Sequence, residues 1–335
     1  MATLGNKFVD LIDVYKEQNP DGSVADIIEM LAEMNPILDD AIAVECNQAT
    51  KHLHTVRTGL PSVAWGMLYK GIPQSKSTKA QVEDTTGFVE GLSTVDTRLL
   101  ELARNPGNLR MNEGKAFLES MSQEGATKIF YGNTASDPEQ FLGFAPRFNS
   151  PTAQNGSQLV DAGGTGDDNT SIWFVTWGEN QCHLLYPQNT MAGIDRQDKG
   201  EQRVEDGDGN PYYVKEELFR WHLGLAVKDW RYVARICNID VSDMADNSVA
   251  LYDYLRSAYY KLWNRRVAGG NIAIYCNRDV MESLDALATN AGASDAFIRL
   301  KSGTDIQGKE VLTYRGIPIR ETDALVNTEE AISFS

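Results

Sequence analysis

The amino-acid sequence predicts an α+β fold for this 335-residue chain. Helix-like and strand-like patterns are both present, but they do not alternate in the β-α-β order that builds a doubly wound parallel sheet. One long helix is expected near the end of the first third, with strands before and after it. The chain exceeds the roughly 250–300 residues at which a single hydrophobic core stops growing, so we expect two or more structural modules.

The N-terminal residues predict an arm of two short amphipathic helices. Apolar residues recur at helical spacing over residues 8–15 and again over residues 27–34, with the turn sequence Asn-Pro-Asp-Gly at 19–22 between them. Ser23 can cap the second helix, and Pro36 follows its end. Two such helices have little to pack on by themselves, so we expect the arm to dock elsewhere.

A long two-stranded excursion is expected from residue 45 to residue 92. Its outgoing strand is predicted from apolar residues that alternate on one face: Val63, Trp65, Met67 and Tyr69. A polar tip containing Lys76 follows, and a return strand is expected through Ala80 and Val82 to Phe88. Because an isolated hairpin is marginal in water, these faces need cover from the main body or from another copy of the chain.

The stretch from residue 111 to residue 131 predicts a helix about twenty residues long, which spans roughly 30 Å. One stripe at helical spacing holds Met111, Gly114, Leu118, Met121, Gly125 and Ile129. Each glycine costs about 1 kcal/mol relative to alanine inside a helix, which indicates that another backbone crosses close to this stripe. Gly132 is expected to end the helix as a residue free to take a positive φ. An ordinary core helix is the alternative that this pattern leaves open.

The remaining chain predicts several strands and two further helices. Trp173 and Trp177 lie in an apolar strand pair, and Lys228-Asp229 is expected to form a bulge within one continuous strand. The predicted order is a polar loop at 149–169, strands at 171–186, 212–214 and 222–239, a helix at 247–262, a strand at 272–275, a helix at 279–289 and a strand at 310–319.

Charge and cysteine content narrow the class of protein. Asp and Glu number 47 and Lys and Arg 31, a formal net charge of −16, so tight binding to nucleic-acid phosphates is not expected.

An apolar run of about 18 residues, which a membrane-spanning helix needs, is not found. The N-terminus has no signal-peptide pattern, so folding in a cytoplasm is expected. The cysteines are predicted to be buried free thiols of a reducing compartment: Cys46, Cys182, Cys237 and Cys276.

Two histidines have the spacing with which a zinc site can begin. His52 and His54 would share one strand face, but no third ligand at suitable spacing accompanies them. A half-exposed strand face is therefore the preferred interpretation of this pair, and no metal site is expected.

A second stretch resembles a calcium loop. Asp206, Asp208, Asn210 and Glu217 occupy positions 1, 3, 5 and 12 of such a loop. Pro211 stands at position 6, where glycine normally makes the sharp turn, and proline cannot take the positive φ required. We expect a hairpin turn here, and a metal-dependent hydrolase is the alternative left open.

No enzymatic activity and no cofactor are expected. The sequence has neither a Gly-x-Ser-x-Gly elbow nor a Gly-x-x-x-x-Gly-Lys phosphate loop. Trp173 and Trp177 leave open a carbohydrate-binding or adhesive surface protein, although sheet core is the preferred role for them. Arms that lack a core of their own, attached to an acidic α+β body, favour a subunit that interlocks with copies of itself.

Several stretches, in order along almost the whole chain, carry a resemblance to a known family. They are TGLPSVAW at 58–65, SKST at 75–78, FYGN at 130–133, PEQFLG at 138–143, GLAVKDWRYV at 224–233 and GIPIR at 316–320. The chain resembles the major capsid (coat) protein of tailed double-stranded-DNA bacteriophages, and is similar to the epsilon-fifteen type of short-tailed phage.

This resemblance implies the tailed-phage coat fold and its division into parts. The implied parts are an N-terminal arm at 1–44, an extended loop at 45–107, a peripheral domain at 108–240 with a spine helix at 111–131, and an axial domain at 241–335 with a return strand. The implied function is a structural subunit of an icosahedral shell built from hexamers and pentamers. Its extended loop would contact the spine helix of a neighbouring copy through Val63, Trp65, Met67, Tyr69 and Lys76.

The resemblance also implies the partners and the location of the protein. The expected partners are other copies of the chain, a separate scaffolding protein, a portal protein, a possible cement or decoration protein, and packaged double-stranded DNA bound without sequence specificity. No membrane partner is expected. Assembly of a procapsid would take place in the host bacterial cytoplasm, and the matured shell would be part of the virion.

Overall fold

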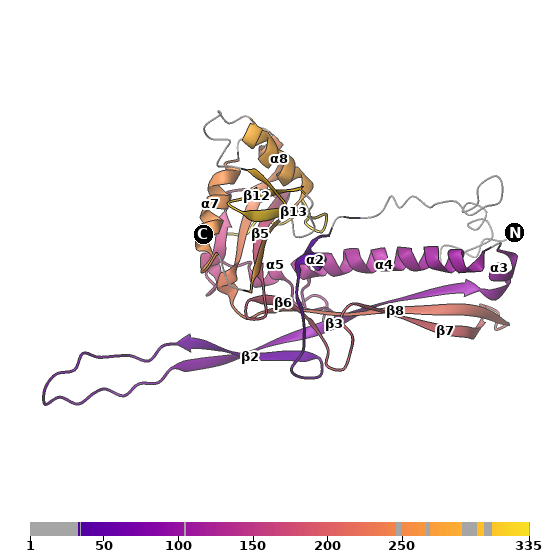
Figure 1. Cartoon of the computed structure of the whole chain (residues 1–335), viewed down its shortest axis with the longest axis horizontal. Helices are drawn as coiled ribbons and strands as arrows, with labels where there is room; N and C mark the ends of the chain where they lie inside the picture. The colour runs from indigo at the N-terminus through magenta and orange to yellow at the C-terminus, as the bar shows by residue number, and fades with distance from the viewer. Residues whose placement is uncertain are drawn as a thin grey trace.

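The computed structural model describes residues 33, 35–103, 105–245, 249–265, 269–289, 300–304 and 310–334. Two regions meet in it: a lobe built on a sheet with two helices, and a long helix that lies on a ribbon of strands (Figure 1). An extended hairpin projects from the junction, pointing away from the far end of the long helix. The two helices predicted before residue 35 lie outside the described residues, apart from Glu33.

The long helix α4 runs from Pro106 to Tyr131 and begins before the predicted residue 111. The Asn105 side chain caps it by accepting a hydrogen bond from the backbone N–H of Asn108 at 3.4 Å, and Pro106 occupies the first turn, where its missing N–H costs nothing. The prediction for the helix end was wrong in one respect. Gly132 has a φ of −52°, and glycine is needed there because a Cβ would lie 2.6 Å from the carbonyl oxygens of Lys128 and Phe141.

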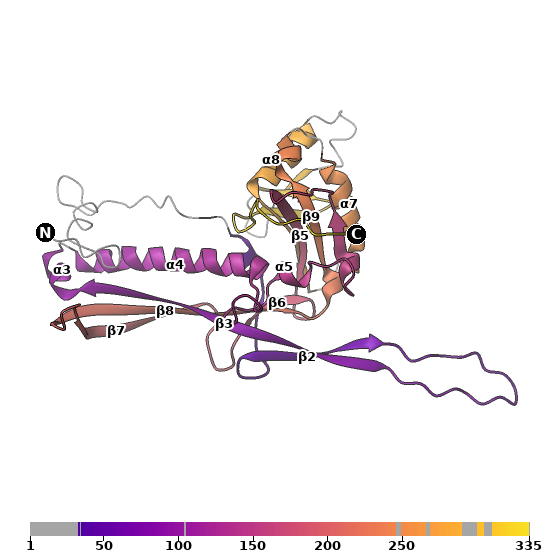
Figure 2. The same ribbon diagram turned by 180° about the vertical axis from the view of Figure 1, so that it is seen from behind.

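A ribbon of antiparallel strands lies along α4 (Figure 2). It consists of β3 (Thr78–Asp96), β8 (Pro211–Val227) and β7 (Ile194–Glu205), and α3 (Thr97–Leu102) connects its far end to α4. The pairing of β3 with β8 runs from Thr86↔Gly224 to Asp96↔Val214. Strand β7 was not predicted, because its sequence is almost wholly polar and shows no alternation of apolar residues.

Gly114 and Gly125 of α4 leave room for aromatic rings from β8. A Cβ at Gly125 would lie 2.2 Å from the ring of Trp221, and one at Gly114 would lie 3.3 Å from Phe219. The expectation of a crossing backbone was therefore wrong, since the neighbours are side chains. Helix and ribbon approach closely only where these positions lack a side chain.

Two members of the predicted stripe do not face the ribbon. Gly114, Met121, Gly125 and Ile129 are buried, whereas Met111 and Leu118 are 47% and 38% exposed. Phe117 packs toward the ribbon, and its ring stacks on Phe219 with 5.6 Å between centroids. Phe117, three residues after Gly114, thus faces the strands, whereas Leu118, four residues after it, faces solvent.

The paired part of the extended hairpin is shorter than predicted. Strand β2 (Lys51–Gly59) pairs with β3 from Lys51↔Thr85 to Gly59↔Thr78, so the predicted return strand is confirmed. The predicted outgoing strand through residues 63–69 is wrong: residues 60–77 form no strand, and Tyr69 has a φ of +64°. Pro61 and Pro73 have no N–H to donate, so a regular ladder cannot continue past them on both sides.

The lobe contains a central sheet whose neighbouring strands follow the order β9-β5-β10-β13-β12-β11. We call this sheet with its two helices the two-helix lobe. Its strands are β4 (Leu159–Asp161), β5 (Asn169–Trp177), β9 (Val233–Asp240), β10 (Asn271–Cys276), β11 (Lys301–Thr304), β12 (Glu310–Tyr314) and β13 (Ile317–Glu321). Its two covering helices are α7 (Leu251–Lys261) and α8 (Arg278–Thr289), and the short helix α6 (Val241–Ala245) follows β9.

Short elements join the lobe to the ribbon. They are α2 (Ile37–Asp40), β1 (Ala43–Glu45), α5 (Phe144–Arg147), η1 (Gly156–Gln158), β6 (Cys182–Tyr186) and η2 (Trp230–Tyr232). Strand β6 pairs with β1 on one side and with β8 on the other. It is through β6 and β8 that the two regions share one continuous sheet.

Two predicted strands are each divided in the structure. The stretch at 222–239 is the end of β8 followed by β9, and Lys228-Asp229 is no bulge: the Asp229 side chain accepts a hydrogen bond from Arg231 N at 3.0 Å and starts the turn η2. The stretch at 310–319 is a hairpin, β12 and β13. Arg315 and Gly316 form its turn with φ values of +52° and +82°, the geometry of a two-residue hairpin loop.

The lobe sheet has a hydrophobic core on each face. Trp173 and Trp177 are wholly buried on one face, where the ring of Phe144 lies 5.7 and 6.0 Å from theirs. The other face is covered by α7 and α8, whose Leu255 and Leu284 are wholly buried. Neither tryptophan offers a free face for stacking a sugar, so the carbohydrate-binding interpretation loses its only support.

The glycine–tryptophan contact between α4 and β8 can be tested by substitution. We expect Gly125→Ala to lower the free energy of unfolding by about 1–3 kcal/mol, the usual cost of overpacking, because its Cβ would meet the Trp221 ring. Gly107→Ala is the matched control in the same helix, since its Cβ would meet only Asn105 Oδ1 at 3.6 Å. The control should be neutral or stabilising by up to about 1 kcal/mol.

Guanidinium titration of the purified subunit measures both variants. Equal changes in the free energy of unfolding at the two positions would contradict the proposed packing.

Candidate functional site

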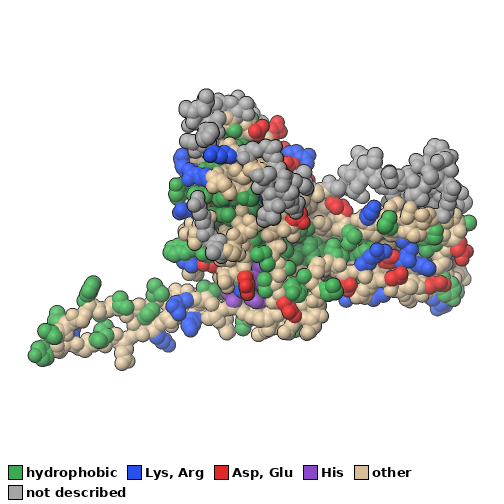
Figure 3. All heavy atoms as spheres, viewed as in Figure 1, with side chains coloured by type: hydrophobic (Ala, Val, Ile, Leu, Met, Phe, Trp, Pro, Cys, Tyr) green, Lys and Arg blue, Asp and Glu red, His purple; other side chains and the backbone are tan. Residues whose placement is uncertain are grey.

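Residues 60–77, here called the apical loop, expose a concentration of apolar side chains at the end of the extended hairpin (Figure 3). Val63, Trp65 and Tyr69 are more than 90% exposed. The other large apolar members are Leu60, Met67, Leu68 and Ile72. Burying one such side chain stabilises by about 1.5–3 kcal/mol, and a contiguous exposed patch marks an interaction site. The loop has the composition of a contact surface, and the described part of its own chain leaves these side chains exposed.

The net charge of the apical loop is positive, whereas that of the whole chain is negative. Its only charged residues are Lys70 and Lys76, giving it a charge of +2 in a chain of −16. The Ser75 hydroxyl donates to the carbonyl of Ser62 at 2.7 Å, and Lys70 N donates to Met67 O at 3.2 Å. The first bond joins the two sides of the loop and the second closes a turn at its tip, while the apolar side chains remain exposed.

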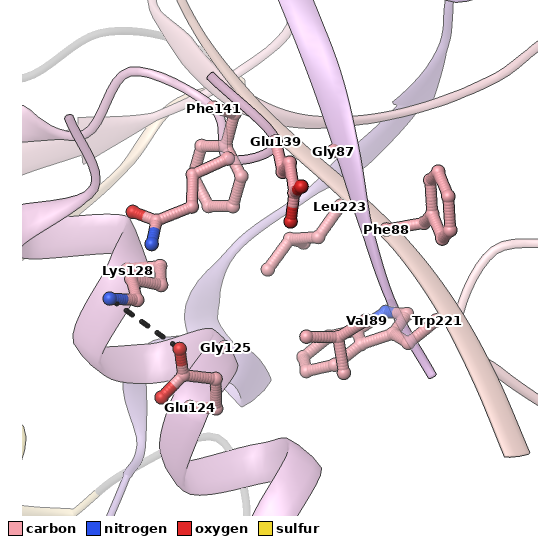
Figure 4. Close-up of a pocket in the computed structure, with 11 residues that line it drawn as sticks. Gly87, Phe88, Val89, Glu124, Gly125, Lys128, Glu139, Phe141, Trp221 and Leu223 are labelled. Atoms are coloured by element: carbon pink, nitrogen blue, oxygen red, sulfur yellow. Dashed lines mark ion pairs between the residues drawn. The ribbon is translucent and has the colours of Figure 1, made fainter. Parts of the chain in front are cut away.

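A groove with an apolar floor lies between α4 and β3 (Figure 4). Its floor is made by Val89, Trp221 and Leu223, and Gly87 and Gly125 also line it. A second hollow shares Val89 and Glu124 with it and continues along α4. The charged side chains around the two hollows are mostly acidic: Glu33, Glu90, Glu124, Glu139 and Lys128. Glu90 is paired with Arg220 and Glu124 with Lys128, so the negative charge beside this apolar surface comes mainly from Glu33 and Glu139.

The strand β3 has an open edge beside this groove. The ladder with β2 ends at Lys51↔Thr85, and from Gly87 to Asp96 the strand pairs only with β8 among the described residues. Unpaired backbone N–H and C=O groups on such an edge can pair with a strand from another chain.

The base of the extended hairpin holds a cluster of histidines. His52 and His54 on β2 meet His183 on β6, and the rings of His52 and His183 lie 5.5 Å apart in an edge-on arrangement. Asp84 on β3 lies 3.7 Å from His54 and forms a 2.7 Å ion pair with Arg147. His52 is only 7% exposed, so the prediction of a half-exposed strand face was wrong. The cluster fixes the hairpin on the body.

Burial sets the protonation of this cluster. It lowers the pKa of His183 from 6.5 to about 4, and Lys228 acts in the same direction. Burial also lowers the pKa of His52 and of His54, against the opposing effect of Asp84. The imidazoles are thus neutral at neutral pH. Across the described part of the chain, no group of three or more His, Cys, Asp or Glu side chains is placed to hold a metal ion.

The stretch that resembled a calcium loop is the turn between β7 and β8, as predicted. The Asp206 carboxylate accepts hydrogen bonds from the backbone N–H of Asp208 at 3.0 Å and of Asn210 at 2.7 Å, which lower its pKa. Glu217 lies within β8 and is paired with Arg110 and Arg196. The carboxylate oxygens of Asp206 and Glu217 therefore already have partners in the turn and in the ribbon.

Several convergent groups were not predicted, because they come from distant segments. Arg235 on β9 is buried and pairs with Glu329 at 2.9 Å, and the Tyr131 hydroxyl at the end of α4 donates to the same glutamate at 2.5 Å. This network ties the last described residues to the spine helix. No local pattern identifies it, since residues 131, 235 and 329 have no shared periodicity. The four cysteines are buried free thiols, as predicted.

A family model and several solved structures match this chain. A family model for major capsid protein GP7 matches residues 19–333. The capsid structure of bacteriophage epsilon15 is 34% identical, covers 99% of each chain and has a TM-score of 0.78. The holo-SrpI encapsulin complex from Synechococcus elongatus is 11% identical over 69% of this chain and 96% of that chain, with a TM-score of 0.47.

The capsid of Myoviridae phage XM1 is 13% identical over 64% of this chain and 95% of that chain, with a TM-score of 0.43. A search of curated proteins returned no match. No helix in the described ranges is long and apolar enough to cross a membrane.

The histidine cluster predicts a loss of stability in mild acid. Because the folded pKa of His183 lies below 6.5, its contribution is complete above pH 6.5 and is lost as the pH falls toward 4. We expect the denaturant midpoint of the subunit to fall over this range. His183→Gln should flatten the pH dependence, whereas His222→Gln, outside the cluster, should keep most of it. An unchanged slope in His183→Gln would contradict the account.

Proposed function

This chain belongs to the family of major capsid protein GP7 and is a structural subunit of a bacteriophage capsid shell, and from that premise we propose that the apical loop holds one copy to its neighbour. The observation that carries the proposal is the full exposure of Trp65 and Tyr69 at the end of a hairpin that leaves the body. A self-assembling shell supplies the cover that these side chains lack within one chain.

The proposed receiving surface is the spine helix α4 of the neighbouring copy, with the groove between it and β3. Met111 and Leu118 are the stripe residues of α4 that its own ribbon leaves exposed. The charges also favour this pairing, because Lys70 and Lys76 of the loop would meet a rim of glutamates. Such complementarity fixes the register of a contact and disfavours wrong ones.

Moderate strength in each contact suits assembly. Truncation of an aromatic residue at the centre of an interface costs about 2 kcal/mol or more. A single contact of that size allows a misplaced subunit to leave, while several contacts per copy act together and make the closed shell durable.

We propose the division of the chain that the family implies. Residues 1–44 would be an N-terminal arm, residues 45–107 the extended loop, residues 108–240 the peripheral domain and residues 241–335 the axial domain. Hexamers and pentamers would form through the axial domains. The extended loops would then link subunits across the shell.

Further partners belong to the same proposal. A separate scaffolding protein would guide assembly in the host cytoplasm, a portal protein would occupy one vertex, and a cement protein could clamp the outside. The packaged double-stranded DNA would meet the shell without sequence-specific binding. A net charge of −16 supports this, because a repulsive wall lets DNA slide during packaging and ejection. No catalytic role is proposed.

The loop contact can be tested with one substitution. Trp65→Ala should leave the subunit folded, because the Trp65 side chain is fully exposed in the described structure, and should lower the yield of closed particles. Met191→Ala is the control, since Met191 is also exposed but lies outside the apical loop. Sedimentation of the protein co-expressed with its scaffold measures the yield. Normal particles from Trp65→Ala would refute the role of the loop.

A further inference from the structure

A polar cavity of about 270 Å³ opens in the two-helix lobe, away from the surfaces considered so far. Its lining residues come from the end of β5, the C-terminal end of α7 and the residues after it, the start of β10 and the turn between β12 and β13. Among the lining residues that can donate hydrogen bonds, three could bind an anion: Thr176, Arg265 and Arg315.

Two arginines of this cavity converge on one pair of aromatic rings. The guanidinium of Arg265 lies 5.2 and 4.9 Å from the ring centres of Tyr259 and Tyr260, and that of Arg315 lies 5.1 and 5.3 Å from the same two rings. Arg315 also donates a hydrogen bond to the Tyr260 hydroxyl at 3.1 Å, and Arg265 donates to the carbonyl of Tyr259 at 3.1 Å. The tyrosines therefore hold both cations in place.

Neither arginine is neutralised by a carboxylate among the described residues. Other arginines of the lobe are paired, as Arg235 is with Glu329 and Arg320 is with Asp40, each at 2.9 Å. Two positive charges fixed on the same rings repel each other, and an anion between them would remove that repulsion. Their position is unusual in a chain in which acidic residues outnumber basic ones by 16.

Thr176, near the end of β5, lines the same cavity and is 2% exposed. Its buried Oγ1 has no hydrogen-bond partner among the described residues. Leaving such a group unpaired costs about 1–3 kcal/mol, so an unsatisfied hydroxyl that lines a cavity points to a ligand or a water. Gly270 and Gly316 also line the cavity, where they present no side chain to a ligand.

We propose that this cavity binds a phosphate group. Two guanidiniums and one hydroxyl, contributed by three separate segments, match a tetrahedral oxyanion whose charge is close to −2, and paired arginine forks are suited to such an anion. A carboxylate has only two oxygens in one plane and half that charge. Free phosphate matches this description, whereas the phosphodiester of DNA has two terminal oxygens and a single charge, so free phosphate is the expected ligand and DNA is the competitor that the experiment tests.

Isothermal titration of the full-length subunit with inorganic phosphate tests the proposal. We expect saturable binding by the wild type. Arg265→Gln with Arg315→Gln should weaken it by about tenfold or more, the size of losing a charge-assisted hydrogen bond. Thr176→Val keeps the shape of the side chain and should weaken it by a smaller factor. Arg203→Gln, an exposed arginine on β7 paired with Glu205, is the control and should bind as the wild type does.

Two further measurements separate the sources and guard against misfolding. Displacement of phosphate by an oligothymidylate without terminal phosphate would assign the site to DNA, and failure to displace it would assign the site to free phosphate. Arg315→Lys keeps the charge but loses the fork, so partial affinity is expected in a folded protein. No binding to the wild type, or binding undiminished in both the double variant and Thr176→Val, would overturn the proposal.

Discussion

The structure depends on one imbalance. The apical loop exposes apolar side chains, and the described part of its own chain does not bury them. The body of the chain has two hydrophobic cores, one on either side of one sheet, which bury Trp173, Trp177 and Phe174. The apical loop carries seven large apolar residues that no part of the described chain covers. Because burial of apolar surface is the dominant favourable term in folding and association, this loop makes another copy of the chain the natural partner.

The rest of the fold provides a rigid mounting for that loop. Strand β3 is a single element of 19 residues that belongs to the hairpin at one end and lies under α4 at the other. The histidine cluster with Asp84 and Arg147 fixes its middle, and the ring of Trp221 fixes α4 above it. A displacement of the loop is therefore coupled to the helix that a neighbouring loop is proposed to contact.

The sequence was sufficient for the elements with strong periodicity and insufficient where distant segments meet. The helix α4 and the burial of Trp173 follow from local patterns, and the earlier start of α4 required attention to Pro106. The alternation around Trp65 suggested a strand, but flanking prolines prevent a ladder. The contact of His183 with β2 could not be predicted, because 131 residues separate it from His52 and no periodicity connects them.

Hydrogen exchange of the apical loop, compared between the free subunit and the closed shell, tests the central claim most directly. The account predicts that amides of residues 60–77 exchange rapidly in the free subunit, where few of them are hydrogen-bonded within the chain. In the shell the same amides should be strongly protected, because a neighbouring copy would bury them. Equal protection in the two states, whether high or low, would contradict the claim that sister copies cover this loop.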